Sequence, residues 1–219
     1  MPHALLIRTL VSRPFAENTY VVRLPGRQDA LVIDPGLEPE IILDFLRQER
    51  LTVAAILNTH AHGDHIGGNA DLKHAFPQAP LVIGVNDAAL LTDPEGNLSA
   101  PFGLPIVSPP ADRVVREGDV VEAAGLRLEV LDVPGHSPGH VVYLYRGSPD
   151  IIFGGDVLFR GGIGRCDFPN ANGPLLLQGI RDKLLTLAAD AVVYPGHGPA
   201  TTVGHERASN PFVGGSELS

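Results

Sequence analysis

Three histidines and an aspartate crowd the stretch N-T-H-A-H-G-D-H-I-G-G at residues 58–68. Imidazole nitrogens and carboxylate oxygens are donors that zinc, iron and manganese accept in proteins. The stretch directly follows an apolar run of strand length, so it lies in a loop, where side chains can converge on one point. The alternative is a polar turn whose histidines only hydrogen-bond to one another. We interpret the stretch as a metal site whose donors are His60, His62, Asp64 and His65.

Three later segments supply further donors. His136 lies in V-P-G-H-S-P-G-H, Asp156 in F-G-G-D-V-L-F and His197 in Y-P-G-H-G-P, and each follows an apolar run. A catalytic zinc takes three protein ligands and a water, so seven donors are too many for one ion. They suit two divalent ions that share a carboxylate, which we expect to be Asp156. The donors are imidazoles and carboxylates with no thiolate, a set that suits zinc, iron or manganese. We expect zinc, with iron or manganese as alternatives.

The elements that must hold these loops are short strands and a few helices. Apolar runs at Val53–Leu57 and Ala191–Tyr194 lead into donor segments, and the spacing predicts helices over Glu38–Glu49, over Gly67–Ala75 and from Pro174 onward. Further strands are expected at Ala4–Thr9, Thr19–Arg23, Ala30–Ile33, Leu81–Val85, Val120–Ala123, Leu126–Leu131, Val141–Tyr145 and Ile151–Phe153. Neither half of the chain can cover its own sheet. We therefore expect an α/β protein with two sheets packed face to face and helices outside.

The stretch from Thr92 to Asp112 is rich in proline, glycine and serine and has no apolar periodicity. At that length it is expected to be a functional loop and not a linker. No other segment is typical of a domain boundary. We therefore predict a single domain over residues 1–219.

The composition argues against several classes of protein. A hydrophobic content of 44% and a charged content of 19% are typical of globular chains. The net charge of −9, with no basic stripe, argues against a nucleic-acid partner, and no apolar run approaches the ~20 residues of a membrane helix. Cys166 is the one cysteine, and the N-terminus does not resemble a secretion signal, so we expect a cytoplasmic location. No pattern indicates an oligomeric state.

The motifs T-H-A-H-G-D-H, G-H-S-P-G-H, G-D and P-G-H-G together resemble those of the metallo-β-lactamase superfamily, over nearly the full chain. F-R-G-G-I-G-R-C-D-F-P-N and Y-P-G-H-G-P-A-T-T-V-G-H-E-R-A-S-N-P-F are similar to stretches of glyoxalase II-type thioesterases, in their short bacterial type II form. The resemblance implies a four-layer αββα sandwich. It also implies one metal on His60, His62 and His136, a second on Asp64, His65 and His197, and Asp156 as the bridge.

The activity that the resemblance implies is hydrolysis of S-2-hydroxyacylglutathione thioesters, for example S-lactoylglutathione to lactate and glutathione. A bound divalent ion lowers the pKa of water to about 7, so a bridging hydroxide is available at neutral pH and no serine or cysteine nucleophile is needed. Asp64 and Asp156 would be the catalytic carboxylates. Three alternatives stay open on the same fold: a mononuclear iron persulfide dioxygenase, a lactonase or β-lactamase, and a non-catalytic protein that binds a metal or ligand.

The sequence also leads to specific predictions for the C-terminal end and for three single residues. The chain ends 22 residues after His197, so we expect no C-terminal helical glutathione-binding domain. Arg165, in R-G-G-I-G-R-C-D-F, stands where the long enzymes of the family have a basic residue that contacts glutathione, so it is the candidate substrate contact. The alternative for Arg165 is a solvated loop arginine. Asp34 is expected to orient a metal-binding side chain or a nearby loop, with termination of its strand as the alternative, and His140 to support the donors or the local structure.

Overall fold

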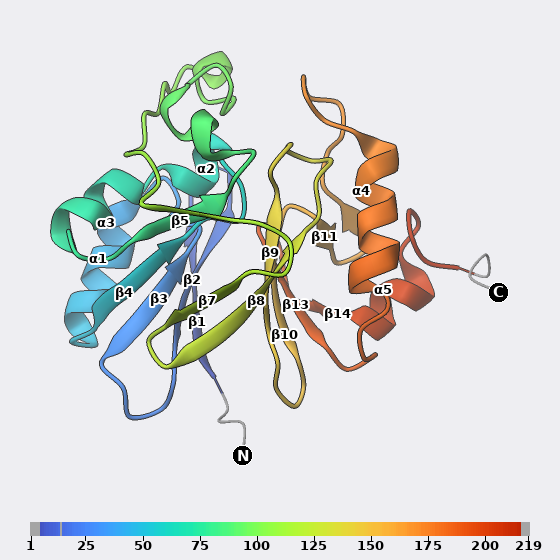
Figure 1. Ribbon diagram of the computed structural model, residues 1–219, viewed down its shortest axis with the longest axis horizontal. Helices are drawn as coiled ribbons and strands as arrows, with labels where there is room; N and C mark the ends of the chain where they lie inside the picture. The colour runs from blue at the N-terminus through green and yellow to red at the C-terminus, as the bar shows by residue number, and fades with distance from the viewer. Residues whose placement is uncertain (1–4, 14, 216–219) are drawn as a thin grey trace.

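The structure, a computed structural model, describes residues 5–13 and 15–215 and has four layers (Figure 1). Two six-stranded sheets pack face to face, and helices lie on the two outer faces. This confirms the αββα sandwich expected from the sequence. The first residue of the expected strand Ala4–Thr9 lies outside the described residues.

The first sheet contains strands in chain order, and its second half is parallel. Its strands are β1 (Leu6–Ser12), β2 (Glu17–Arg23), β3 (Asp29–Ile33), β4 (Thr52–Leu57), β5 (Leu81–Gly84) and β6 (Arg113–Val115). β1, β2 and β3 pair antiparallel, whereas β3, β4, β5 and β6 pair parallel. Helices α1 (Pro39–Gln48) and α3 (Asn69–Ala75) lie on its outer face, and the short α2 (Gly63–Ile66) falls within the histidine cluster.

The second sheet has the order β14-β13-β10-β9-β8-β7. Its strands are β7 (Val120–Ala123), β8 (Leu126–Asp132), β9 (Val141–Tyr145), β10 (Ile151–Gly155), β13 (Val192–Pro195) and β14 (Thr201–Thr202). β10 and β13 are parallel, and the other pairs are antiparallel. Its outer face carries α4 (Gly173–Gly179), a π-helical turn η3 (Ile180–Leu184) and α5 (Val203–Ser209). The side chain of Asn172 caps α4 by accepting a hydrogen bond from the amide of Leu175.

The position of the core is set by side chains that alternate between the two faces of each strand. Leu31 and Ile33 of β3 point between the sheets and join Tyr143 of β9, whereas Val32 points outward to Leu46 of α1. On the other outer face, side chains of the second sheet pack against α4, η3 and α5 in a third cluster. Each fully buried aliphatic side chain contributes about 1.5–3 kcal/mol. The sandwich therefore provides a rigid base for the loops at its edges.

Some details of the secondary structure differ from the expectation. In α1, Ile42 and Leu46 are fully buried, but Ile41 and Phe45 are only half-buried, because the helix lies on the surface with one narrow stripe against the sheet. The sequence did not predict β6, β14 or the hairpin of β11 (Leu158–Phe159) and β12 (Gly162–Ile163), which are too short for periodicity to show. None of the described helices has the length and apolar character needed to cross a membrane.

Candidate metal centre

The sheet topology brings the four donor-bearing loops to one edge of the sandwich. His60 follows the carboxyl end of β4, and Asp156 and His197 follow the carboxyl ends of the parallel pair β10 and β13. His136 precedes β9, which runs antiparallel to β10, so it lies at the same edge. Backbone hydrogen bonds of 2.8 Å join the loops, from Val141 N to the Thr59 carbonyl and from Gly196 N to the Gly155 carbonyl. All seven donors expected from the sequence lie together.

A deep group of donors consists of His60, His62 and His136. Their ring nitrogens come within 4.8 Å of one another, and all three residues are buried. Burial, followed by the neighbouring histidines, lowers the pKa of His60, and burial lowers that of His62 to about 3. The imidazoles are therefore neutral at physiological pH, which is the form that binds a metal ion.

A shallow group consists of Asp64, His65 and His197, whose donor atoms also come within 4.8 Å of one another. His197 Nε2 lies 3.2 Å from Asp64 Oδ2, and His65 Nε2 lies 3.7 Å from the same oxygen. Burial opposes the charged form of His65, but the charges of Asp64 and Asp156 outweigh it and raise the pKa of this histidine. His65 is fully buried, whereas the side chains of His197 and Asp64 are 27% and 19% exposed.

Asp156 lies between the two groups. Its Oδ1 is 3.4 Å from His65 Nε2, and its Oδ2 is 3.4 Å from His136 Nε2 and 3.5 Å from His197 Nε2. Among the described residues, His65 Nε2, His136 Nε2 and Asp156 Oδ1 are buried and have no hydrogen-bond partner. Unpaired buried polar atoms are rare. Three of them around one space fit metal donors, so the residues present suit a pair of divalent ions.

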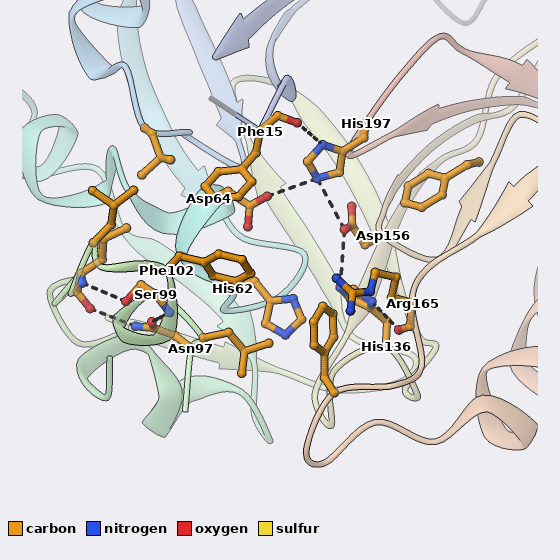
Figure 2. A pocket seen from close by; sticks show the side chains of 17 residues that line it. Phe15, His62, Asp64, Asn97, Ser99, Phe102, His136, Asp156, Arg165 and His197 are labelled. Carbon is orange, nitrogen blue, oxygen red and sulfur yellow. Dashed lines mark hydrogen bonds and ion pairs between the residues drawn. The ribbon is translucent and has the colours of Figure 1, made fainter. Parts of the chain in front are cut away.

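Hydrogen bonds orient the donor rings. His136 Nδ1 donates to the carbonyl of Arg165 (2.9 Å), and His197 Nδ1 donates to the carbonyl of Phe15 (3.0 Å). A histidine that donates from Nδ1 has the lone pair on Nε2 available for a metal. Figure 2 shows both bonds, with the two rings turned toward Asp156.

Asp34 and His140 support the donors as the sequence predicted. Asp34 Oδ1 accepts from Thr59 N (2.7 Å), its Oδ2 accepts from Thr59 Oγ1 (2.7 Å), and Oδ2 lies 3.2 Å from His65 Nδ1. His140 Nε2 accepts from the amide of Asp156 (3.0 Å), and its ring stacks on that of His60 at 4.6 Å. Asp34 thus orients His65, and His140 holds the loop of the central aspartate.

Asp87 is a supporting residue that the sequence analysis missed. It follows β5, and its buried carboxylate accepts from the amides of Ala61 (3.0 Å) and Gly139 (2.6 Å) and from the hydroxyl of Ser137. It therefore ties the loop of His60 and His62 to the loop of His136. The signal was present, because Asp87 comes shortly after an apolar strand, as Asp34 does.

A pocket of about 310 Å³ opens above the donors. His62, Asp64, His136, Asp156 and His197 contribute to its lining (Figure 2). The other side chains that line it are mostly apolar: Phe15, Leu37, Leu98, Phe102, Leu104, Ile106, Phe159 and Phe168. Four of them come from the aperiodic stretch between Thr92 and Asp112, so the expected functional loop forms a wall of the pocket. Concave, largely apolar sites with a few polar groups are typical of small-molecule binding.

Arg165 also lines this pocket, as a substrate contact must. Its guanidinium donates to both oxygens of Asp167 (2.9 and 2.8 Å) and lies 4.4 Å from the centre of the Phe168 ring. The side chain is 62% exposed, so this ion pair contributes little to stability. Cys166 is half-buried with its Sγ 3.3 Å from the Gly164 carbonyl, and it is not among the residues lining the pocket.

An αββα sandwich with histidine and aspartate donors at one edge defines a class of metal-dependent hydrolases. Residues 12–197 match the family model of the Metallo-beta-lactamase superfamily, and the chain belongs to this superfamily. It is 38% identical to the "Probable metallo-hydrolase YqgX" of Bacillus subtilis over 206 residues, which are 94% of this chain and 96% of that protein. It is 37% identical to the hydroxyacylglutathione hydrolase GloC of Haemophilus influenzae, over 85% of this chain and 88% of that protein.

Solved structures show the same fold. The crystal structure of BLEG-1, a B3 metallo-beta-lactamase, superposes with a TM-score of 0.91 at 36% identity and covers 96% of this chain and 100% of that chain. TTHA1623 in a di-iron-bound form superposes with a TM-score of 0.83 at 38% identity, over 94% of this chain and 99% of that chain.

Proposed function

We propose that the protein hydrolyses S-2-hydroxyacylglutathione thioesters with the help of two divalent metal ions. The observation that carries the proposal is the convergence of seven histidine and aspartate side chains beside a pocket of small-molecule size. The 37% identity to GloC, which extends over most of both chains, supports a glutathione thioester as the substrate.

In this proposal the deep group holds one ion, the shallow group holds the other, and Asp156 contributes to both. Bound zinc, iron or manganese would supply a hydroxide nucleophile at neutral pH and stabilise the developing oxyanion. The chain's own residues fix the geometry: Asp34 and the carbonyls of Arg165 and Phe15 hold the rings of His65, His136 and His197. We propose zinc first, and the di-iron-bound form of TTHA1623 supports iron as the alternative.

Arg165 would bind the glutathione part of the substrate. Its planar guanidinium can hold a carboxylate with two hydrogen bonds, as it now holds Asp167. Because the side chain is exposed, exchanging Asp167 for a substrate carboxylate costs little.

A β-lactamase activity is the second candidate. The superposition on BLEG-1 over nearly the whole of both chains favours it, since the hydroxide that bound ions would supply could attack an amide as well as a thioester.

The test combines metal analysis with three assays on purified, metal-supplemented protein. We expect two ions per chain, hydrolysis of S-lactoylglutathione, and loss of this activity after treatment with a chelator. Hydrolysis of a chromogenic cephalosporin in place of the thioester would assign the lactamase function. Oxygen uptake on glutathione persulfide without thioester hydrolysis would assign a persulfide dioxygenase.

A further inference from the structure

Apolar side chains line a part of the pocket that we call its apolar end. Leu98, Phe102, Leu104 and Ile106 line it from the loop between η1 (Ala88–Thr92) and β6, and Phe15 joins them from a separate segment. The rings of Phe15 and Phe102 meet edge to face, with centroids 5.5 Å apart. Phe102 is nevertheless 56% exposed. Clustered exposed apolar side chains beside a polar site are typical of a surface that a ligand covers.

This wall is fixed by hydrogen bonds. Asn97 donates from Nδ2 to the carbonyls of Leu90 (3.2 Å) and Ile106 (3.0 Å), and Ser99 Oγ accepts from Ile106 N (2.9 Å). Gly63, at the start of α2, donates its amide to the Asn97 carbonyl (2.9 Å). The loop is thus attached to the helix that carries Asp64 and His65. A preformed wall selects substrates without the cost of ordering a loop.

Arg165 gives its side of the pocket a positive charge, although the ring of Phe168 also packs against its guanidinium. Figure 2 shows Phe102 and Arg165 on opposite sides of His62. A substrate carboxylate can pair with Arg165 but finds no cation among the apolar side chains, and burying an unpaired charge is costly. If Arg165 binds the glutathione part as proposed, the acyl substituent lies toward Phe102.

We infer that this apolar end, formed by Phe15, Leu37, Leu98, Phe102, Leu104 and Ile106, binds an aromatic or bulky apolar substituent on the acyl group. The inference rests on the proposed function and specifies the acyl group of its substrate. A methyl substituent such as that of a lactoyl group leaves this end of the 310 Å³ pocket largely unfilled. A phenyl ring can pack edge to face against Phe15 and Phe102.

The test uses two thioesters that differ only in this substituent, S-mandeloylglutathione with a phenyl ring and S-lactoylglutathione with a methyl group. One methylene in a hydrophobic pocket changes kcat/KM by about 10–200-fold, so we expect the parent protein to prefer the mandeloyl substrate by at least about tenfold. Phe102→Ala should remove most of this preference, and Phe102→Leu should restore part of it. Phe212→Ala is the matched control, because Phe212 is similarly exposed (53%) and is not among the residues lining the pocket.

A binding measurement separates this inference from the proposed function. Calorimetry on the metal-loaded protein compares mandelate with lactate, and we expect tighter binding of mandelate that Phe102→Ala abolishes. If neither thioester is hydrolysed but this binding difference is seen, the proposed substrate is wrong and the apolar subsite stands. Equal binding of the two acids together with equal turnover of the two thioesters would overturn the inference. A uniform loss on both substrates in Phe102→Ala, with the preference intact, would also overturn it.

Discussion

The deep and shallow donor groups differ in burial and in support. His60, His62 and His136 are almost inaccessible, and their loops are tied together by the buried carboxylate of Asp87. In the shallow group a buried carboxylate, that of Asp34, contacts His65, and the Phe15 carbonyl holds His197, but Asp64 and His197 are partly open to the pocket. Preorganised, buried donors bind more tightly than exposed ones that must be ordered. If the two groups bind ions as proposed, we expect the ion of the deep group to be held more tightly and that of the shallow group to be lost more readily.

Asp156→Ala should have the largest effect, because this side chain contributes to both groups. Mutations of residues that only orient a ligand cost about 10–100-fold, so loss of the shared donor should lower kcat/KM by more than ~100-fold. Metal analysis should find less than one ion per chain. Asp71→Ala, which removes an exposed acid of α3, is the control and should keep both ions. Two ions retained in Asp156→Ala would show that the groups do not share this carboxylate.

Asp64→Ala should affect the shallow group alone. We expect one retained ion and a loss of turnover of about 100-fold, with a thermal midpoint near that of the parent, because Asp64 lies on the short helix α2 and is not part of the apolar core. Steady-state kinetics, elemental analysis and a thermal melt measure the three quantities. Near-parental activity would mean that Asp64 is not a ligand.

Asp87→Asn should weaken the deep group without removing a donor. The variant leaves at least one buried hydrogen-bond donor without an acceptor, at a cost of about 1–3 kcal/mol. For a chain of this size the thermal midpoint should fall by roughly 2–4 °C per kcal/mol. Affinity for the tighter ion, from a chelator titration, should fall about 10–100-fold. Asp71→Asn is the matched control. An unchanged metal affinity in Asp87→Asn would show that the deep group does not depend on the hydrogen bonds of Asp87.

Arg165→Ala should have the smallest effect, because it leaves both donor groups intact. His136 Nδ1 donates its hydrogen bond to the backbone carbonyl of Arg165, so this bond survives the substitution. KM for a glutathione thioester should rise several-fold and kcat should stay within a few-fold, since binding remote from the reaction centre acts alike in ground and transition states. A small aryl ester should hardly respond. The control is Arg160→Ala, because Arg160 is an exposed arginine between β11 and β12. Equal losses on both substrates in Arg165→Ala would assign Arg165 a structural role.

The sequence predicted the sandwich and the loops that carry the donors, because both leave local signals. Apolar runs ending in glycine, proline and histidine mark where strands reach one edge, and Asp34 was recognisable as an acid at such an end. The ligand roles, the single-domain organisation and the cytoplasmic location stay predictions. Asp87 also follows an apolar strand, but its role was missed because its partners at Ala61 and Gly139 are backbone amides, which leave no side-chain pattern in the sequence.

The apolar wall could not be predicted for a related reason. Phe15, Leu37 and Phe102 come from three separate segments, and each alone is an ordinary apolar residue. They form one surface only because the tertiary structure brings together loops that have no apolar periodicity. The specificity of the pocket is therefore a property of contacts between segments, whereas the donor set is a property of short motifs.

The loop between η1 and β6 carries none of the seven donors, although it forms a wall of the pocket. It joins two neighbouring parallel strands, β5 and β6, and is attached to α2 mainly through backbone groups, which almost any sequence supplies. Binding specificity and metal chemistry thus lie on separate parts of the chain, so we expect that replacing this one segment can change the substrate that is accepted without altering the donor set.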